Sequence, residues 1–249
     1  MKKVLGALRR AIDDYQMIQD GDRVAVGVSG GKDSLLLAKA LNDYSKFAPE
    51  KFTVVGIHID MGFKDTDKER FAEIEAFFKK EGMEFHVVKT DIAEIIFDIR
   101  KESNPCSLCS KMRRGALCTA ANELNCNKIA LGHHADDVLE TMLLSLAFES
   151  RFSTFSPTSY LDRTKVTVIR PFVYLEEKYV VSSARRLELP VLHNPCPADK
   201  RTERQHAKEF VGKLIQEVPD IKDHMLSALF HPERNNLWPL RPEKKENDD

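Results

Sequence analysis

The sequence predicts an α/β fold in which a five-stranded, mainly parallel sheet is covered by helices on both faces. Short runs rich in β-branched residues alternate with longer segments of helical periodicity, which is the pattern of βαβ units. Several of these runs are apolar without interruption, such as F-T-V-V-G-I-H-I, and this is typical of strands buried on both sides.

The expected elements follow in chain order. The first segment, M-K-K-V-L-G-A-L-R-R-A-I-D-D-Y, alternates charged and apolar residues at helical spacing. Five strands are expected at residues 23–28, 52–59, 84–88, 128–131 and 166–169. The helices that follow them are expected at residues 33–44, which are leucine-rich, and at 67–81, 92–100, 136–148 and 176–187. Two more helices, at 202–217 and 221–230, would form a C-terminal helical extension.

These elements suggest four regions. Residues 1–20 are expected to be an N-terminal helix packed on the main domain, and residues 21–190 to be that main α/β domain, with an inserted Cys-x-x-Cys loop. Residues 191–240 carry the loop around Cys196 and the helical extension. The highly charged end, residues 241–249, is expected to be a disordered tail.

Composition places the chain among soluble globular proteins. Of 249 residues, 42% are apolar and 31% are charged, and the net charge is −1. No apolar run approaches the roughly 20 residues that span a bilayer, and the charged N-terminal segment does not resemble a signal peptide. We therefore expect a cytoplasmic protein with no membrane partner.

A glycine turn after the first strand predicts an anion site. In V-S-G-G-K-D-S, glycines allow a tight turn and a close ligand approach, and the free amides at the start of the next helix favour phosphate. A Walker A loop is excluded because Asp33 separates Lys32 from Ser34, and the spacing does not match G-x-G-x-x-G. The alternative is a tight strand–helix connection without a ligand.

The same turn resembles a known loop. S-G-G-K-D-S is similar to the PP-loop of the adenine-nucleotide alpha-hydrolase superfamily, whose members split ATP between its α and β phosphates. Members adenylate a substrate oxygen, release pyrophosphate and let a nucleophile displace AMP. The resemblance implies that ATP phosphates are bound by Ser29, Gly30, Gly31, Lys32, Asp33 and Ser34.

Three of the five cysteines suggest a metal or redox site. Cys106 and Cys109 form a C-x-x-C pair followed by basic residues, and cations lower the pKa of nearby thiols. A redox pair, half of a zinc site and two iron–sulfur ligands remain open. Cys196 lies in a second proline-bounded loop, also followed by cations (Lys200, Arg201 and Arg204). If the two loops meet, His193 or His206 could complete a zinc tetrahedron.

The other two cysteines, Cys118 and Cys126, lie on a stretch of helical spacing with apolar or neutral neighbours. We interpret them as buried structural residues.

The stretch G-H-H-A-D-D follows the fourth strand. Ligands bind outside the carboxyl ends of the strands in open α/β sheets, so this stretch should face the glycine turn. We assign His133 to the nucleotide site and Asp136 or Asp137 to Mg²⁺, which prefers oxygen ligands. Lys32 would join them in neutralising phosphate charge. The alternative is that both carboxylates only complement the helix dipole.

The span from Cys106 to Arg170 narrows the resemblance. C-S-L-C-S-K-M-R-R-G, N-K-I-A-L-G-H-H-A-D-D-V-L-E-T and V-I-R-P-F closely resemble the tRNA 2-thiocytidine synthetases, which place sulfur on C2 of an anticodon-loop cytidine. The resemblance implies that Cys106, Cys109 and Cys196 hold a [4Fe–4S] cluster with one iron open to carry sulfide. Related enzymes thiolate uridine, so the base remains open between cytidine and uridine.

Charge patterning suggests where RNA would bind. Residues 100–114 carry five cations against one anion, and a nearly neutral protein must contact phosphates through such local patches. From this stretch and the V-I-R-P-F motif we assign RNA binding to Lys111, Arg113, Arg114 and Arg170. A solvated basic face is the alternative.

Together these observations predict ATP- and Mg²⁺-dependent thiolation of a tRNA pyrimidine. The expected partners are tRNA and a cysteine desulfurase or other sulfide donor, and a homodimer is the assembly we consider. Two rivals belong to other classes. One is an ATP pyrophosphatase with structural zinc that modifies a base or small molecule, and the other is a nucleotide-binding RNA module without catalysis.

Overall fold

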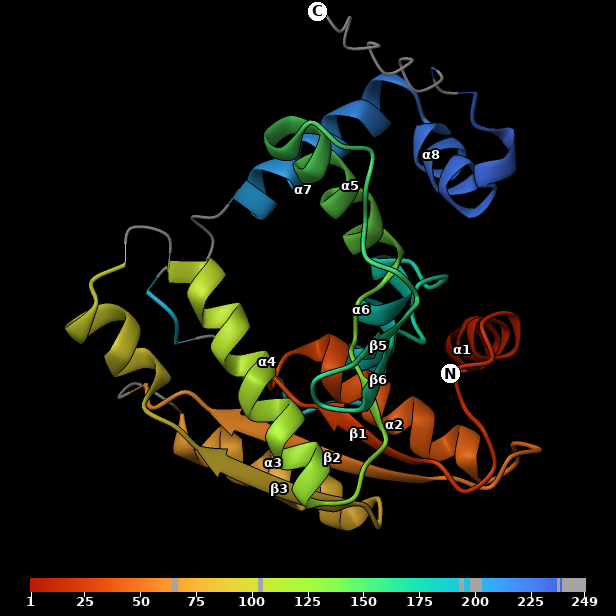
Figure 1. The fold of residues 1–249 in the computed structure, drawn as a ribbon. Coiled ribbons are helices and arrows are strands. Elements are labelled where there is room, and N and C mark those ends of the chain that lie inside the picture. Colours follow the sequence, from red (N-terminus) through yellow and green to blue (C-terminus); the bar gives the residue numbers. More distant parts are fainter. Residues whose placement is uncertain (64–66, 103–104, 193–194, 198–202, 237, 239–249) are drawn as a thin grey trace, which may run out of the picture.

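A computed structural model describes residues 1–63, 67–102, 105–192, 195–197, 203–236 and 238. Its centre is one six-stranded sheet with the order β3-β2-β1-β4-β6-β5 (Figure 1). The strands are β1 (Arg23–Gly27), β2 (Thr53–Asp60), β3 (Glu84–Lys89), β4 (Lys128–Ala130), β5 (Thr158–Leu161) and β6 (Val166–Ile169). All neighbouring pairs are parallel except β5 with β6, so the predicted fold class is confirmed.

The central strand β1 shows why both faces of the sheet need cover. Successive side chains of a strand point to opposite faces, and here all three interior residues are fully buried. Val24 and Val26 belong to one apolar core, and Ala25 belongs to the other. An uninterrupted apolar strand therefore signals a sheet between two helical layers.

Most helical residues of the larger core come from four helices: α1 (Lys2–Asp14), α2 (Lys32–Ser45), α3 (Lys68–Lys80) and α6 (Glu177–Arg186). The leucines at positions 35, 36 and 37 of α2 are completely buried in it. Apolar residues of α1 occur at helical spacing, with Val4, Leu8, Ala11 and Ile12 buried. This layer covers the face of the sheet on which α2 and α6 lie side by side (Figure 1).

The opposite face is covered by α4 (Pro105–Glu123) and the short π-helix η1 (Glu94–Ile99). Leu117 and Cys118 of α4 and Ile96 of η1 are buried there against the strands. Cys126, just after α4, is 2% exposed, so the interpretation of Cys118 and Cys126 as buried is confirmed.

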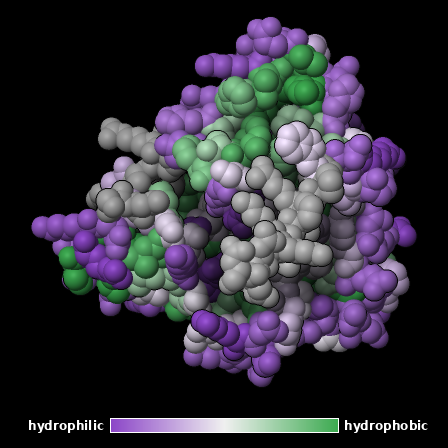
Figure 2. Space-filling view, turned by 45° about the horizontal axis from the view of Figure 1, so that its top comes forward, coloured by the Kyte–Doolittle hydropathy of each residue, from purple (hydrophilic) through white to green (hydrophobic). Residues whose placement is uncertain are grey.

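Three remaining α-helices stand above the sheet: α5 (Ala135–Glu149), α7 (Glu203–Glu217) and α8 (Ile221–Phe230), with the 3₁₀ turn Pro232–Arg234 after them. Both α7 and α8 pack on α5 (Figure 1). Figure 2 shows apolar side chains gathered in the upper part of the molecule, and the exposed apolar residues of this region include Leu146, Phe148 and Phe210. No helix among the described residues is both long and apolar enough to cross a membrane.

Two local expectations need correction. The sheet has a sixth strand, β5, which is antiparallel, at the edge and only half-buried, so its four residues carry no strong apolar pattern. The Cys-x-x-Cys pair does not lie in a loop, because α4 begins at Pro105 and places both cysteines in its first two turns. Proline is favoured at the first position of a helix, so Pro105 marks the start of α4 and not a loop.

Candidate functional site

The glycine turn between β1 and α2 is held closed by its own serines. The Ser34 hydroxyl donates to the Gly31 carbonyl at 2.9 Å and accepts from the Ser29 amide at 3.2 Å, and the Gly31 amide donates to the Ser29 hydroxyl at 3.3 Å. Gly31 caps the helix without a side-chain hydrogen bond. The start of α2 therefore presents main-chain amides rather than a capping side chain, which suits an anion.

The segment leading to Cys196 rests on this turn. The Leu192 amide donates to the Gly30 carbonyl at 2.9 Å. Gly30 has a φ of +82°, and a Cβ there would lie 2.6 Å from Cδ1 of Leu192. Only glycine combines this backbone conformation with so close a neighbour. The turn and the cysteine-bearing segment thus form one packed unit.

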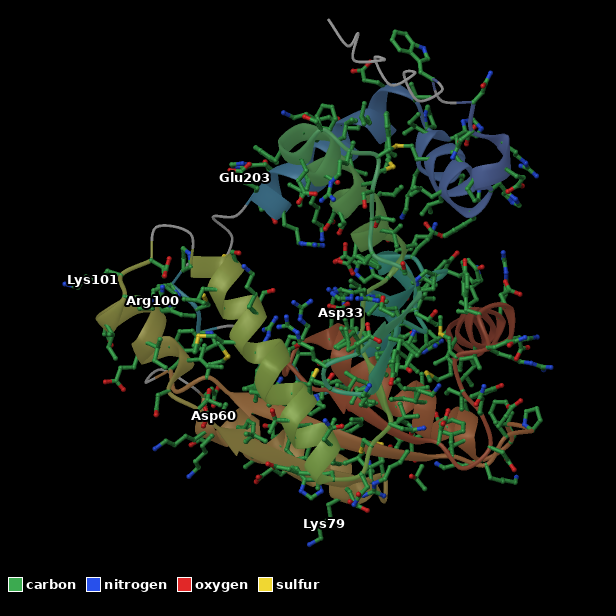
Figure 3. All side chains as sticks on the ribbon, viewed as in Figure 1. Asp33, Asp60, Lys79, Arg100, Lys101 and Glu203 are labelled. Atoms are coloured by element: carbon green, nitrogen blue, oxygen red, sulfur yellow. The ribbon has the colours of Figure 1, made fainter. Side chains whose placement is uncertain are left out.

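The stretch after β4 packs against the turn, as the sheet topology led us to expect. A Cβ on Gly132 would lie 3.0 Å from the Asp33 carbonyl. His134 is 4% exposed, and its Nε2 lies 3.8 Å from Asp33 Oδ1. Asp33 Oδ1 is buried without a hydrogen-bond partner in the part of the chain that the structure describes, although the Lys32 ammonium lies 3.2 Å from it. Asp33, near the centre of Figure 3, therefore offers an oxygen to a ligand at the turn.

Asp136 and Asp137 both hold structure together. Asp136 accepts the first amide of α6, that of Glu177, at 2.7 Å, and its other oxygen lies 2.6 Å from Lys222 Nζ. Asp137 accepts the His134 amide at 2.9 Å in a capping box, and its other oxygen lies 3.1 Å from an Arg204 nitrogen. The helix-dipole alternative thus describes part of what each residue does, and any metal would compete with a cation for either oxygen.

The Lys32 ammonium lies between Asp33 of the turn, 3.2 Å away, and Glu177 of α6. Its Nζ lies 3.1 Å from Glu177 Oε1, and the other oxygen of Glu177 accepts from Lys208 of α7 at 2.6 Å. Burial alone would lower the pKa of Lys32, but Asp33 and Glu177 raise it overall. Burial likewise raises the pKa of Glu177, yet Lys208 and Lys32 outweigh burial and lower it to about 2. Both groups are therefore charged at neutral pH, and Glu177 aligns the lysine of the turn.

His133 and Arg170 form a half-buried pair beside Phe155. Arg170 Nε donates to His133 Nδ1 at 3.2 Å, which leaves the histidine proton on Nε2. The Arg170 guanidinium lies over the Phe155 ring, and the His133 ring contacts the same ring at a tilt. Burial lowers the pKa of His133; Asp137 opposes this and Arg170 adds to it, and the pKa falls to about 4. Burial, with Arg114 nearby, lowers the pKa of Arg170 to about 10. Arg170 thus supports His133, and its assignment to RNA binding stays a prediction.

The three cysteines assigned to a cluster share one neighbourhood. Cys106 is exposed at the start of α4, and Cys109 and Cys196 are half-buried. Burial raises the pKa of the Cys109 thiol; Arg113 lowers it, and Cys196 and Cys106 raise it again. Thiols that hinder one another's ionisation suit a metal cation, which favours the thiolate form. No three His, Cys, Asp or Glu side chains among the described residues already enclose a metal position.

The zinc alternative names His193 and His206 as possible fourth ligands. His206 lies on α7, beside Glu203 and in an apolar groove between α5 and α7. His193, Lys200 and Arg201 lie outside the described residues, as does the predicted tail at 241–249.

The predicted basic stretch does not form one surface. Lys111, Arg113 and Arg114 are exposed along α4. Arg113 and Arg114 are near enough to influence the pKa values of Cys109 and Arg170, respectively. In contrast, Arg100 and Lys101 project at the outer edge of the molecule, far from Asp33 (Figure 3). Only the α4 part of the stretch lies toward the site.

Sequence reasoning missed two acidic residues of this site and the role of Arg204. Glu177 aligns Lys32, and Arg204 joins α7 to Asp137, to Thr141 Oγ1 at 3.1 Å and to Glu140 at 3.4 Å. Glu140 is only 5% exposed. The one available signal was a glutamate on the otherwise apolar stretch of α5, in D-D-V-L-E-T-M-L-L, where a charge needs a partner.

Glu140 should make stability depend on pH. Burial, and next Asp137, raise the pKa of Glu140 to about 7, so between about pH 4.5 and 7 the native state keeps a proton that the unfolded state has released. The free energy of unfolding should fall as the pH rises through this window. We expect Glu140→Gln to abolish this loss and to be more stable than wild type by about 2 to 3 kcal/mol at pH 8, with little difference at pH 4.5.

Urea unfolding at both pH values measures this effect. Taking the difference between variant and wild type removes the opposite contribution of His133, which both proteins share. Glu149→Gln is the matched control, because Glu149 lies on the same helix but is exposed, and should give no gain at pH 8. A variant-to-wild-type difference that stays constant with pH would refute the role of Glu140.

The fold and the turn define a protein that uses ATP through a PP-loop, and the PP-loop domain family matches residues 5–215. The chain belongs to this family and, within it, to the family of the tRNA-cytidine(32) 2-sulfurtransferases. It is 38% identical to the protein of that name from Geobacter sulfurreducens over 242 residues, which are 96% of this chain and 93% of the relative. The protein of that name from Pelobacter propionicus is 39% identical over 93% of this chain and 87% of its own length.

A solved structure extends the likeness to three dimensions. It is the U34-tRNA thiolase NcsA from Methanococcus maripaludis with its [4Fe-4S] cluster. The TM-score is 0.75 at 25% sequence identity, and the match covers 94% of this chain and 79% of the thiolase.

Proposed function

We propose that this protein is an ATP-dependent tRNA sulfurtransferase that replaces the C2 oxygen of a cytidine in the anticodon loop by sulfur. The observation that carries the proposal is the packing of the glycine turn against both the G-H-H-A-D-D stretch and the segment before Cys196. This packing supports the proposal that the phosphate site and the thiol site lie near each other. Family membership supports tRNA as the substrate and position 32 as the target.

The phosphate half of the site performs activation. The C2 oxygen attacks the α-phosphorus of ATP and pyrophosphate leaves, so that a poor leaving group becomes AMP. The chain's part is positioning and charge neutralisation, as in other phosphoryl transfers. The amides of the turn bind the departing phosphates, and Lys32, held by Glu177, neutralises their charge.

Magnesium fits this half of the site. Asp33 supplies a buried oxygen without a hydrogen-bond partner among the described atoms. Asp137 is the better of the two residues after β4, because its partner Arg204 has a side chain that is 44% exposed, whereas Lys222 beside Asp136 is 14% exposed. The ion would supply further neutralisation of the phosphates.

The thiol half of the site fits an iron–sulfur cluster. Cys106, Cys109 and Cys196 would hold it, since thiolates are the ligands iron takes in such clusters. When bound, a [4Fe–4S] cluster with three protein ligands supplies one iron that can carry sulfide. The remaining step is displacement of AMP from C2 by sulfur. A cysteine desulfurase or another sulfide donor in the cytoplasm would replenish the sulfur, and a homodimer is the proposed assembly.

Product analysis tests the activation step. Anaerobically purified protein, supplied with ATP, Mg²⁺, sulfide and tRNA, should release AMP and pyrophosphate in proportion to 2-thiocytidine in the digested tRNA. Release of ADP and phosphate would contradict the proposal. A tRNA in which position 32 is a purine is the control and should give neither product.

A further inference from the structure

A second charged feature lies beside the candidate site. A groove of about 580 Å³ runs between α6, α7 and α8. Its cations come from all three helices: Lys178 and Arg185 from α6, Lys208 from α7 and Lys222 from α8. Three separate helices therefore direct positive charge into one groove, although the whole chain has a net charge of −1.

The carboxylates of the groove only partly neutralise it. Glu177 pairs with Lys208 and Asp136 pairs with Lys222, each at 2.6 Å. Arg185 has no ion pair within the described ranges, and the Lys178 side chain remains 63% exposed although it lies 2.9 Å from Glu176. Arg185 therefore leaves positive charge open to solvent in the groove, and this charge attracts an anion.

The positive surface continues beyond the groove. The Tyr179 ring lies between two lysines, with Lys3 Nζ 4.4 Å and Lys178 Nζ 5.1 Å from its centroid. Lys3 belongs to α1, so the charge extends across α6 onto a fourth helix. A surface of this length suits a chain of phosphates better than one small anion.

The groove shares a wall with the ATP half of the site. Glu177 contacts Lys208 of the groove through one oxygen and Lys32 of the glycine turn through the other, at 3.1 Å. Asp136 lines the groove and is adjacent to Asp137. A polyanion bound in the groove would therefore lie next to the bound nucleotide.

We propose that the groove between α6, α7 and α8 binds the phosphate backbone of the RNA substrate; this rests on the proposed function. The groove is distinct from the α4 cations assigned from the sequence, because α4 and α6 pack on opposite faces of the sheet. The RNA would therefore contact cations on both sides of the site, those of the groove and those of α4. Pyrophosphate released by the reaction also carries phosphate groups that this groove could bind. The experiment below distinguishes RNA from pyrophosphate.

The test compares two double charge reversals. Lys178→Glu with Arg185→Glu alters the groove, and both side chains are exposed, so the variant should fold. Lys79→Glu with Lys80→Glu is the matched control, with the same change in net charge on exposed residues of α3; Lys79 lies at the far end of the molecule from Asp33 (Figure 3). Fluorescence anisotropy with labelled tRNA at several salt concentrations gives the affinity, and calorimetry gives ATP binding.

The groove variant should bind tRNA about tenfold or more weakly than the control, with a salt slope reduced by about 2, while both keep ATP affinity. Equal tRNA affinity of the two variants overturns the inference but leaves the proposed function standing. Loss of pyrophosphate binding in the groove variant with tRNA affinity retained would assign the groove to the product and also overturn it. A wild-type protein that binds no tRNA contradicts the proposed function instead.

Discussion

Gly30→Val should abolish ATP binding, with a loss of affinity of more than about 100-fold, or about 2.7 kcal/mol. Gly30 has a φ of +82°, which a β-branched residue adopts only under strain, and a Cβ there would meet Leu192 at 2.6 Å. The turn must therefore change shape, and its amides lose their common direction toward the phosphates. Isothermal titration calorimetry with ATP and Mg²⁺ measures the effect.

Gly21→Val is the matched control for backbone strain. Gly21 has a φ of +83°, but nothing lies within 4 Å of a Cβ there. It precedes the opposite end of β1 from the glycine turn, so this variant should carry similar strain and still bind ATP. If Gly30→Val binds ATP as tightly as Gly21→Val does, the turn is not the phosphate site.

Cys106→Ala, Cys109→Ala and Cys196→Ala should each lose iron and thiolation while leaving ATP binding largely intact. Cluster binding is a joint property of three ligands, so removing any one should be as damaging as removing another. Chemical analysis of iron and sulfide, the visible spectrum and ATP calorimetry report the cluster and the nucleotide site separately. Cys118→Ala and Cys126→Ala are the controls, because both thiols are buried away from solvent, and should keep iron and activity.

The behaviour of Cys196→Ala separates sulfur transfer from the zinc alternative. A structural zinc contributes folding free energy, so losing a ligand should unfold the protein. A folded, ATP-binding, colourless and inactive variant supports the proposed chemistry. If the wild-type protein contains zinc and the variant is unfolded, the structural-zinc alternative is supported. An active variant would show that Cys196 is not part of the site.

Local pattern was enough to predict most of the fold. Strands β1, β2 and β4 have buried apolar runs and α2 carries buried leucines, because this chain buries both faces of its sheet. The same topology brought Gly132 and His134 to the glycine turn, since carboxyl ends of parallel strands share one edge. The edge strand β5 escaped prediction because an edge needs little apolar surface.

Sequence alone determined the glycine turn, the order of strands and helices except for β5 and the start of α4, and the three cysteines as a candidate metal set. Only the tertiary structure decided what each charged residue does. Arg170 is drawn inward to His133, Glu177 joins Lys32 to Lys208, and Arg204 crosses from α7 to Asp137. These partners lie from 31 to 145 residues apart, and a charged residue looks the same in a sequence whether it faces solvent or a buried partner. Burial and distant neighbours, which exist only after folding, set the charge and role of each group.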